Sequence, residues 1–389
     1  MKPLLILTCF LSLLTEFAAG QNRGVWFWGS TTLPGGGASP YGSIDVVGDT
    51  VAENETVAFF TSYGVKMVYG SYQNRPVSEP AVIAAWNAKL DAAGISSQLL
   101  LDGIAVNDPA FMASLLNKVT NRLINFNNSL ADPAEKFDAL HLDLEPQGLA
   151  LWDGGTPAVK RALLDDLLLA YEDVRALLDT AGFTGLPIYA DIPFFWDKLP
   201  ADGGSVGWAD ATDRDAWFND VAAVLDGVSV MTFSKDNFPA ADAAIDYERT
   251  VGLPGEARLG IQPKVGPSEL WLSIAEFNVV MLAAEAAYGP TGSTDIENYG
   301  FWRHAIATTG IPLAVADVVD VAPDLETSGG GVVIVHGVPG HLYIVRQSTD
   351  LNNWEELRRV RVLAEESVRI PFQADGPGKF FQVEIIVDR

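Results

Sequence analysis

The chain has 389 residues, of which 48% are hydrophobic, and its 50 acidic and 25 basic residues give a formal net charge of -25. Such a charge repels phosphate backbones and anionic lipid surfaces, which argues against a nucleic-acid partner. The hydrophobic content argues against large-scale disorder and suffices for one large domain and one smaller domain.

The first twenty residues have the pattern of a secretory signal peptide. Lys2 precedes an apolar run over residues 4–14, and small side chains occupy positions 18–20. The run is too short to span a bilayer, and no later stretch is apolar for long enough to do so. We therefore expect residues 1–20 to be removed, and the protein to be secreted, periplasmic or held at the cell surface, without a membrane span.

From residue 24 onward, short apolar runs alternate with segments in which apolar side chains recur three and four positions apart. The short runs are typical of buried strands, and the longer segments are typical of helices with one buried face. The expected strands are 24–28, 65–69, 97–101, 139–145, 187–192, 227–233, 258–262 and 299–302, and the expected helices are 80–93, 108–126, 157–181, 211–225 and 268–288. Eight such units favour an α/β fold, a closed (β/α)8 TIM barrel over residues 21–311.

Beyond residue 311 the pattern changes to short strands separated by turns. The expected strands are 331–336, 341–347, 354–362, 367–372 and 380–387. The Pro339-Gly340 pair predicts that a tight turn joins the first two of them as a hairpin. We expect residues 312–389 to form a small antiparallel β-sandwich.

The run from Phe137 to Pro146 is the strongest candidate for a functional site. Successive strand side chains alternate between faces, so His141, Asp143 and Glu145 point the same way. Neighbouring buried carboxylates disfavour their charged forms, which suits an acid that must hold a proton near neutral pH. Because Pro146 ends the strand, Glu145 should lie at the barrel mouth, where barrel enzymes place catalytic groups. A structural polar layer or a bound cation is the alternative interpretation.

Other strand ends carry polar and aromatic side chains. They are Trp28, Ser30, Tyr69, Asp102, Asp191, Ser234, Gln262 and Trp302. Aromatic faces stack on the C–H surfaces of sugars, and carboxylates and amides bind hydroxyl groups, so this set favours carbohydrate as the partner. For any single Trp, packing in the core is the alternative. Residues 194–196, Phe-Phe-Trp, should line a groove as an exposed cluster.

Metal and cofactor chemistry has little support in the sequence. No glycine-rich nucleotide motif follows the first strand, and of the four histidines only His141 lies with carboxylates. The chain has no His-x-x-x-His or Glu-x-x-His pair. We therefore expect neither a metal ion nor a cofactor.

Residues 138–145, Asp-Ala-Leu-His-Leu-Asp-Leu-Glu, resemble the Asp-Gly-x-Asp-x-Asp-x-Glu strand of chitinase-like glycoside hydrolases of family 18. Residues 230–234 are similar to the Met-x-Tyr-Asp strand of that family, and residues 259–261 and Trp302 match in order. The resemblance implies that Glu145 protonates the leaving oxygen and that Asp143 orients the acetamide of the substrate. It also implies that Trp302 forms the floor of a sugar subsite.

The chain departs from the family pattern at several positions. His141 replaces an Asp, Ala139 replaces the Gly, Ser234 replaces an Asp, and Phe233 replaces the Tyr whose hydroxyl helps to hold the acetamide. The strand that ends in Gln262 also lacks the Glu nucleophile of many retaining barrel glycosidases. If cleavage does not use the acetamide, Asp102 or Asp191 must supply the second carboxylate.

The tail resembles a β-module found at the C-terminus of many secreted bacterial proteins. Residues 343–351, the Asn353-Trp354 pair and residues 379–383 carry this resemblance. It implies a role in surface attachment, an accessory role or sugar binding.

Taken together, the sequence predicts a secreted glycoside hydrolase that acts on a polysaccharide or oligosaccharide. Glu145 would be the general acid/base, Asp143 its orienting partner, and His141 would tune Asp143. Two other hypotheses remain open. The barrel is a lectin that binds glycan without cutting it, or it is a surface-attached structural module that presents the tail.

Overall fold

The computed structural model describes residues 22–34, 36–253, 257–266, 269–271, 273–288 and 294–309, together with the backbone of six later strands between residues 319 and 386. The expected signal peptide, residues 1–20, lies outside the described residues. The chain divides into two compact units, Met1–Ala305 and Ile306–Arg389.

Eight parallel strands close into a barrel in chain order, with the last strand beside the first. They are β1 (Arg23–Phe27), β2 (Val65–Gly70), β3 (Ser96–Gly103), β4 (Ala139–Leu144), β5 (Ile188–Pro193), β6 (Gly227–Met231), β7 (Ala257–Ile261) and β8 (Thr294–Ile296). The predicted eight-stranded α/β barrel is therefore confirmed.

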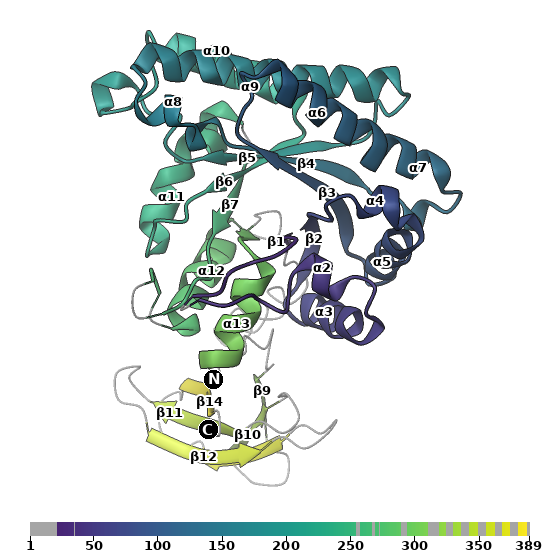
Figure 1. Ribbon diagram of the computed structural model, residues 1–389. Coiled ribbons are helices and arrows are strands. Elements are labelled where there is room, and N and C mark those ends of the chain that lie inside the picture. Colours follow the sequence, from purple (N-terminus) through teal and green to yellow (C-terminus); the bar gives the residue numbers. More distant parts are fainter. Residues whose placement is uncertain are drawn as a thin grey trace. The chain divides into compact units, whose positions relative to one another are not determined.

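Helices surround the strands (Figure 1). The longer ones are α3 (Thr50–Ser62), α5 (Pro80–Ala92), α6 (Pro109–Val119), α9 (Pro157–Thr180), α10 (Ala211–Val224), α11 (Phe238–Tyr247), α12 (Ile274–Tyr288) and α13 (Tyr299–Thr309). Shorter segments are α2 (Ser43–Val46), α4 (Arg75–Ser78), α7 (Asn125–Ser129), α8 (Ala150–Asp153) and the π-helical turns η1 (Thr120–Ile124) and η5 (Glu248–Gly252). Among the described residues, no helix has both the length and the apolar character that a membrane span requires.

Side-chain caps fix the points at which several of these helices begin. Asp49, Asp108, Thr156, Asp210 and Asn237 each accept a hydrogen bond from a backbone N–H of the first helical turn. Those N–H groups have no partner within the helix, so the caps stabilise the helix starts that follow β1, β3, β4, β5 and β6. Each cap also fixes the end of the loop that leads from the preceding strand to its helix, and these loops follow the strand ends that carry site residues.

The prediction that residues 299–302 form the eighth strand is wrong. They begin α13, in which Tyr299, Trp302 and Ala305 are buried at a spacing of three residues, as on one face of a helix. Asn298 caps this helix by accepting hydrogen bonds from the backbone N–H groups of Gly300 and Phe301. The true eighth strand has only three residues, 294–296, and its central residue is charged, so it lacks the apolar run typical of a buried strand.

The second unit contains two three-stranded antiparallel sheets. Their strand orders are β13 (Val368–Gln373), β10 (Gly330–Val335), β9 (Val319–Pro323) and β12 (Glu355–Arg361), β11 (Leu342–Ser348), β14 (Phe380–Ile386). The predicted hairpin is wrong, because β10 and β11 belong to different sheets. Packing of the two sheets as a sandwich remains a prediction.

The interior of the barrel holds a small aromatic cluster below the site. Trp26, Tyr69 and Leu100 are almost fully buried and in contact, and Trp28 and Phe233 pack against them as partly buried neighbours. These residues come from β1, β2, β3 and the segment after β6, so the cluster connects opposite sides of the barrel. It forms the floor beneath the ends of the strands.

Candidate functional site

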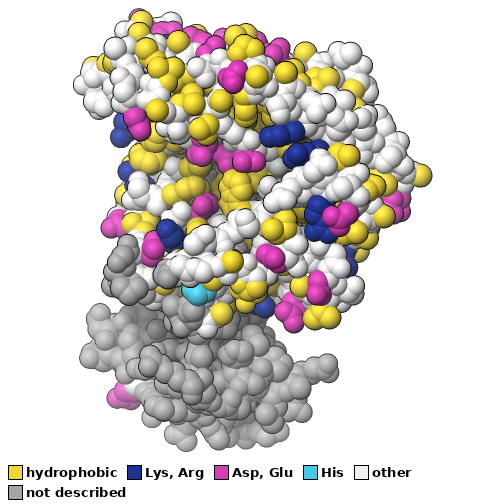
Figure 2. All heavy atoms as spheres, viewed as in Figure 1, with side chains coloured by type: hydrophobic (Ala, Val, Ile, Leu, Met, Phe, Trp, Pro, Cys, Tyr) yellow, Lys and Arg dark blue, Asp and Glu magenta, His cyan; other side chains and the backbone are white. Residues whose placement is uncertain are grey.

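Carboxylates from two adjacent strands meet at the carboxyl end of β4. The Cα atoms of Asp143 in β4 and Asp102 in β3 are register partners, and the backbone N–H of Glu145 donates to the carbonyl of Gly103 over 2.8 Å. Asp102 is exposed, Glu145 is partly exposed, and only 7% of Asp143 is exposed. In the same view as Figure 1, Figure 2 shows acidic side chains in a hollow of the barrel unit, with hydrophobic side chains around them.

Asp143 lies in an unusually unfavourable place for a charged carboxylate. Burial raises its pKa well above the ordinary value, and the negative charges of Asp191, Glu145, Asp102 and Glu297 raise it further. Its Oδ1 atom has no hydrogen-bond partner among the described residues. Asp143 is therefore a buried carboxyl group that can still donate to a ligand or accept from one.

Glu145 has the properties of a proton donor. Burial raises its pKa, a hydrogen bond from Gln147 opposes this shift, and the charge of Asp102 adds to it. The Gln147 amide donates to Oε1 of Glu145 over 2.8 Å. Because Glu145 is also partly exposed, it can hold a proton at higher pH than an ordinary Glu and present it at the mouth.

His141 belongs to a buried network below the mouth. Its Nδ1 lies 3.1 Å from Oε1 of Gln98, its Nε2 lies 2.8 Å from Oδ1 of Asp191, and Trp26 donates to the other oxygen of Asp191 over 2.9 Å. Burial lowers the pKa of His141 to about 3 and raises the pKa of Asp191, so both shifts favour an uncharged pair. Since both ring nitrogens are engaged, His141 is not available to tune Asp143 through a direct hydrogen bond.

A second network lies beside the first inside the barrel, around Asp295 of β8, since Tyr69 stacks on His141 and donates to Asp295. Asp295 accepts hydrogen bonds from Tyr69 over 2.8 Å, from Arg258 over 2.6 to 2.9 Å, and from Ser229. Asp295 is fully buried, and the opposite charge of Arg258 balances it. These groups link β2, β6, β7 and β8, so we interpret them as stabilising the barrel and not as binding a ligand.

Several predicted sugar contacts are instead buried. Tyr69 and Asp191 are each 1% exposed inside the barrel, and Trp302 is 0% exposed in α13, against Phe59 and Tyr63. Trp196, predicted as part of an exposed cluster, is also fully buried. The periodicity shows which face a side chain occupies, but it does not show how deep in the barrel that side chain lies.

The remaining predicted contacts lie near the mouth. Trp28 and Phe233 are partly buried above the aromatic cluster, Gln262 directly follows β7, and Asp102 is exposed at the end of β3. The structure thus brings Asp143, Glu145 and Asp102 together at neighbouring strand ends, with aromatic side chains on the floor beside them.

Glu297, which directly follows β8, is a further carboxylate near the mouth that is not among the predicted site residues. Its backbone N–H donates to the carbonyl of Ile261 over 2.8 Å, and the Gln262 amide donates to its Oε2 over 2.7 Å. Burial raises the pKa of Glu297 to about 7, against the opposing effects of the Gln262 hydrogen bond and of the charge of Lys264. A signal was present, because Asp-Ile-Glu at residues 295–297 repeats the Asp-Leu-Glu pattern of residues 143–145.

The raised pKa of Glu297 predicts a pH-dependent stability. A carboxyl whose pKa is higher in the folded chain binds its proton more tightly there, so it stabilises the fold fully below about pH 4.5 and loses this effect as pH rises through about 7. Urea unfolding between these limits should show the free-energy difference between wild type and Glu297→Gln falling by roughly 1–3 kcal/mol. An unchanged difference over this range would contradict the assignment, and Glu172→Gln on the exposed face of α9 is the matched control.

The buried position of Trp302 predicts that it does not contact a substrate. Trp302→Phe keeps an aromatic ring in the core and removes an indole N–H that has no hydrogen-bond partner among the described residues. We expect a stability loss below about 1.5 kcal/mol and affinity for glycan within about twofold of wild type. A selective loss of glycan affinity in a variant with the wild-type unfolding midpoint would restore Trp302 to the sugar subsite.

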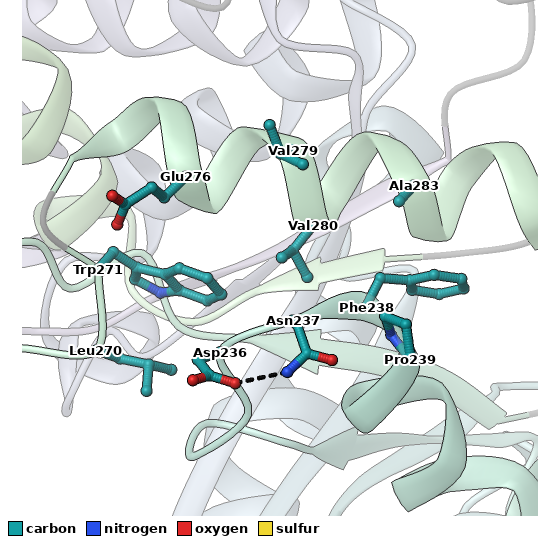
Figure 3. Close-up of a pocket in the computed structure, with 10 residues that line it drawn as sticks. All are labelled: Asp236, Asn237, Phe238, Pro239, Leu270, Trp271, Glu276, Val279, Val280 and Ala283. Carbon is teal, nitrogen blue, oxygen red and sulfur yellow. Dashed lines mark hydrogen bonds between the residues drawn. The ribbon is translucent and has the colours of Figure 1, made fainter.

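A hollow of about 590 Å³ lies apart from these carboxylates, between α11 and α12 (Figure 3). Phe238 and Pro239 line one side, and Trp271 and Val280 line the other, with Asp236 and Glu276 near its ends. None of Asp143, Glu145, Asp102 and Glu297 lines it. Within the described part of the chain, no three His, Cys, Asp or Glu side chains are arranged to hold a metal ion.

Fold and site together define a closed (β/α)8 barrel with carboxylates at the carboxyl ends of β3, β4 and β8. No family model and no curated protein matches the sequence. Among solved structures, the chain is similar to the spore cortex-lytic enzyme of Bacillus megaterium, with a TM-score of 0.37 and 10% identity over 64% of this chain and 53% of that chain. The chain thus spans about half of that enzyme.

Two further similar structures have comparable scores. A family 18 chitinase of Cycas revoluta, solved with a tetramer of N-acetylglucosamine, has a TM-score of 0.39 and 13% identity over 80% of this chain and 84% of that chain. An endo-β-N-acetylglucosaminidase of Cordyceps militaris has a TM-score of 0.38 and 12% identity over 74% of this chain and 86% of that chain. These similarities do not indicate a function, which has to be inferred from the side chains of this chain.

Proposed function

We propose that this chain is a glycoside hydrolase and that Glu145 is its general acid. The arrangement of Glu145 and Asp143 carries the proposal. Glu145 is partly exposed at the end of β4, with a pKa raised by burial, beside an almost fully buried Asp143 that keeps one oxygen without a partner. Barrel packing alone does not require two such carboxyl groups at a strand end.

In the proposed reaction, Glu145 donates its proton to the glycosidic oxygen while the bond from that oxygen to the anomeric carbon breaks. The leaving sugar departs as an alcohol, and positive charge develops on the ring that remains. A water molecule completes the substitution, with its hydroxyl joining the anomeric carbon and its proton passing to a carboxylate. Asp143 would orient the substrate beside Glu145.

The reaction requires a second carboxylate that faces the anomeric carbon. Asp191 is a poor candidate, because both of its oxygens are engaged by Trp26 and His141 and only 1% of the residue is exposed. Asp102 is exposed next to Asp143, and Glu297 is close enough for the charge of Glu145 to raise its pKa. Asp102 and Glu297 are therefore the two candidates for this role.

The proposal places the reaction outside the cytoplasm, after removal of residues 1–20, on a polysaccharide or oligosaccharide. Trp28 and Phe233 at the mouth would offer aromatic faces to the sugar rings. Residues 21–311 would form the catalytic barrel, and residues 312–389 would serve as an accessory or surface-attachment module.

Release of reducing ends from a panel of soluble glycans tests the proposal directly. The purified protein without residues 1–20 should release reducing sugar from at least one glycan at a rate above a heat-inactivated control. Background release from every member of the panel would contradict the hydrolase assignment.

Binding without cleavage is the second candidate function, and one observation favours it. Phe233 has no hydroxyl group with which to hold a substrate polar group, although the resemblance to family 18 places a Tyr there. A lectin of this kind would bind glycan equally well as wild type and as Glu145→Gln, and neither protein would release reducing sugar. Measuring binding and release on the same panel therefore separates the two functions.

A further inference from the structure

We infer that the barrel mouth binds a sugar that carries a free ammonium group, with the carboxylates of Asp143 and Glu297 as its counter-charges and Glu145 beside them as a further acceptor. The inference rests on the proposed function for the class of ligand, a glycan. It goes further by naming the chemical group that distinguishes the preferred sugar, a de-N-acetylated amino sugar.

The buried carboxylate of Asp295 has a cation as its ion-pair partner, whereas the carboxyl groups at the mouth do not. Below the mouth, Arg258 forms an ion pair with Asp295 over 2.6 Å. At the mouth, no Lys or Arg of the described residues lies within ion-pair distance of Asp143, Glu145 or Glu297. The neighbouring Lys264 pairs with Glu269 over 3.3 Å and acts on Glu297 only beyond ion-pair distance, where its charge lowers the pKa of Glu297.

An open buried oxygen provides a second and independent observation. Asp143 is only 7% exposed, and its Oδ1 atom has no hydrogen-bond partner in the part of the chain that the structure describes. Buried polar atoms of folded proteins are almost always paired, so an unpaired one calls for an explanation such as a missing ligand. A ligand that donates a hydrogen bond to Oδ1 would satisfy it.

The other carboxylates also keep an oxygen for a ligand. Gln147 donates to Oε1 of Glu145, and Gln262 donates to Oε2 of Glu297, which leaves the second oxygen of each without a side-chain donor among the described residues. Asp143, Glu145 and Glu297 together therefore offer three acceptors, contributed by β4 and by the segment after β8.

An ammonium group matches these acceptors in number and in charge. It carries three N–H donors and one positive charge, whereas an acetamide offers one N–H donor and a carbonyl oxygen that carboxylates repel. A hydroxyl group has one donor and no charge. The mouth should therefore prefer an amino sugar over both its N-acetylated and its hydroxyl counterparts.

Calorimetric titration of the wild-type protein tests the inference with matched tetramers. The ligands are tetramers of glucosamine and of galactosamine, the N-acetylated form of each, and tetramers of glucose and of galactose. We expect an amino tetramer to bind at least about tenfold more tightly than its two counterparts, as one added charge-assisted hydrogen bond would give. This preference should shrink at high ionic strength.

Charge-removing variants identify the residues responsible. Glu297→Gln should reduce the preference for the amino tetramer at least about fivefold, and Asp143→Asn provides a second test at a different strand. Glu172→Gln on the exposed face of α9 removes the same charge away from the mouth and should leave the preference unchanged. Circular dichroism of each variant confirms that it is folded before binding is measured.

The outcomes separate this inference from the proposed function. Equal or tighter binding of an N-acetylated or hydroxyl tetramer, unaffected by Glu297→Gln, would overturn the inference and leave the glycan site in place. Binding of none of the tetramers, together with no hydrolysis of the glycan panel, would overturn the proposed function and this inference with it.

Discussion

Replacing Glu145 by Gln should lower kcat for hydrolysis of a natural glycan by about 10²–10⁴-fold, the usual contribution of a general acid. The amide has nearly the shape of the carboxyl group and can keep its contact with Gln147, but it has no acidic proton to give to the leaving oxygen. Glycan affinity should stay within a few-fold of wild type, because the floor and the neighbouring carboxylates are unchanged.

A control variant and a limit on the remaining kcat test whether the loss of activity is due to Glu145. Glu172→Gln makes the same chemical change on the exposed face of α9 and should leave kcat unaltered. A Glu145→Gln protein that retains kcat within about threefold of wild type would exclude Glu145 as the proton donor, since its loss would then cost far less than general acid catalysis supplies.

Replacing Asp295 by Ala should cost about 3–5 kcal/mol in the free energy of unfolding, because it leaves the guanidinium of Arg258 buried without its counter-charge. Tyr69 and Ser229 would also lose their acceptor. Urea unfolding followed by tryptophan fluorescence measures this loss. The pair joins β7 to β8, so the variant should also weaken closure of the barrel.

An exposed ion pair provides the control for that measurement. Glu79 pairs with Arg75 over 3.0 Å on the helical segment before α5, and nearly half of its side chain is exposed. Glu79→Ala should cost less than about 1 kcal/mol, as exposed pairs do. Similar small losses for both variants would show that the Asp295 network does not support the barrel.

The barrel could be predicted because seven of its strands are apolar runs bounded by clear breaks. The expected strand 139–145 corresponds to β4 at 139–144, and the expected helix 157–181 corresponds to α9 at 157–180. The eighth strand is the exception. It is three residues long with Asp295 at its centre, and its charge is acceptable only because Arg258 of β7 faces it, a contact that no local pattern contains.

The candidate site was predictable where alternation along one strand decides it, as for Asp143 and Glu145. The sequence did not predict which inward-facing side chains lie at the mouth and which lie deeper in the barrel. Asp191 lies within β5, is 1% exposed, and has both oxygens engaged by Trp26 and His141, so its carboxylate lies inside the barrel. The depth of a side chain in the barrel depends on the stagger between neighbouring strands. That stagger is determined by contacts between parts of the chain that are far apart in sequence. Glu297 was missed for another reason: the three-residue strand before it has no apolar run to mark a strand end, although the Asp-Ile-Glu pattern was present.

The central claim, that Glu145 protonates the leaving group, is tested most directly by varying that group. Aryl glycosides of the sugar that the glycan panel identifies need less protonation as the aryl alcohol becomes more acidic. We predict that the ratio of wild-type to Glu145→Gln kcat/KM falls from about 10³ for a natural linkage to below about 10 for a dinitrophenyl glycoside. A ratio that stays constant across the series would contradict the role of Glu145 as the acid.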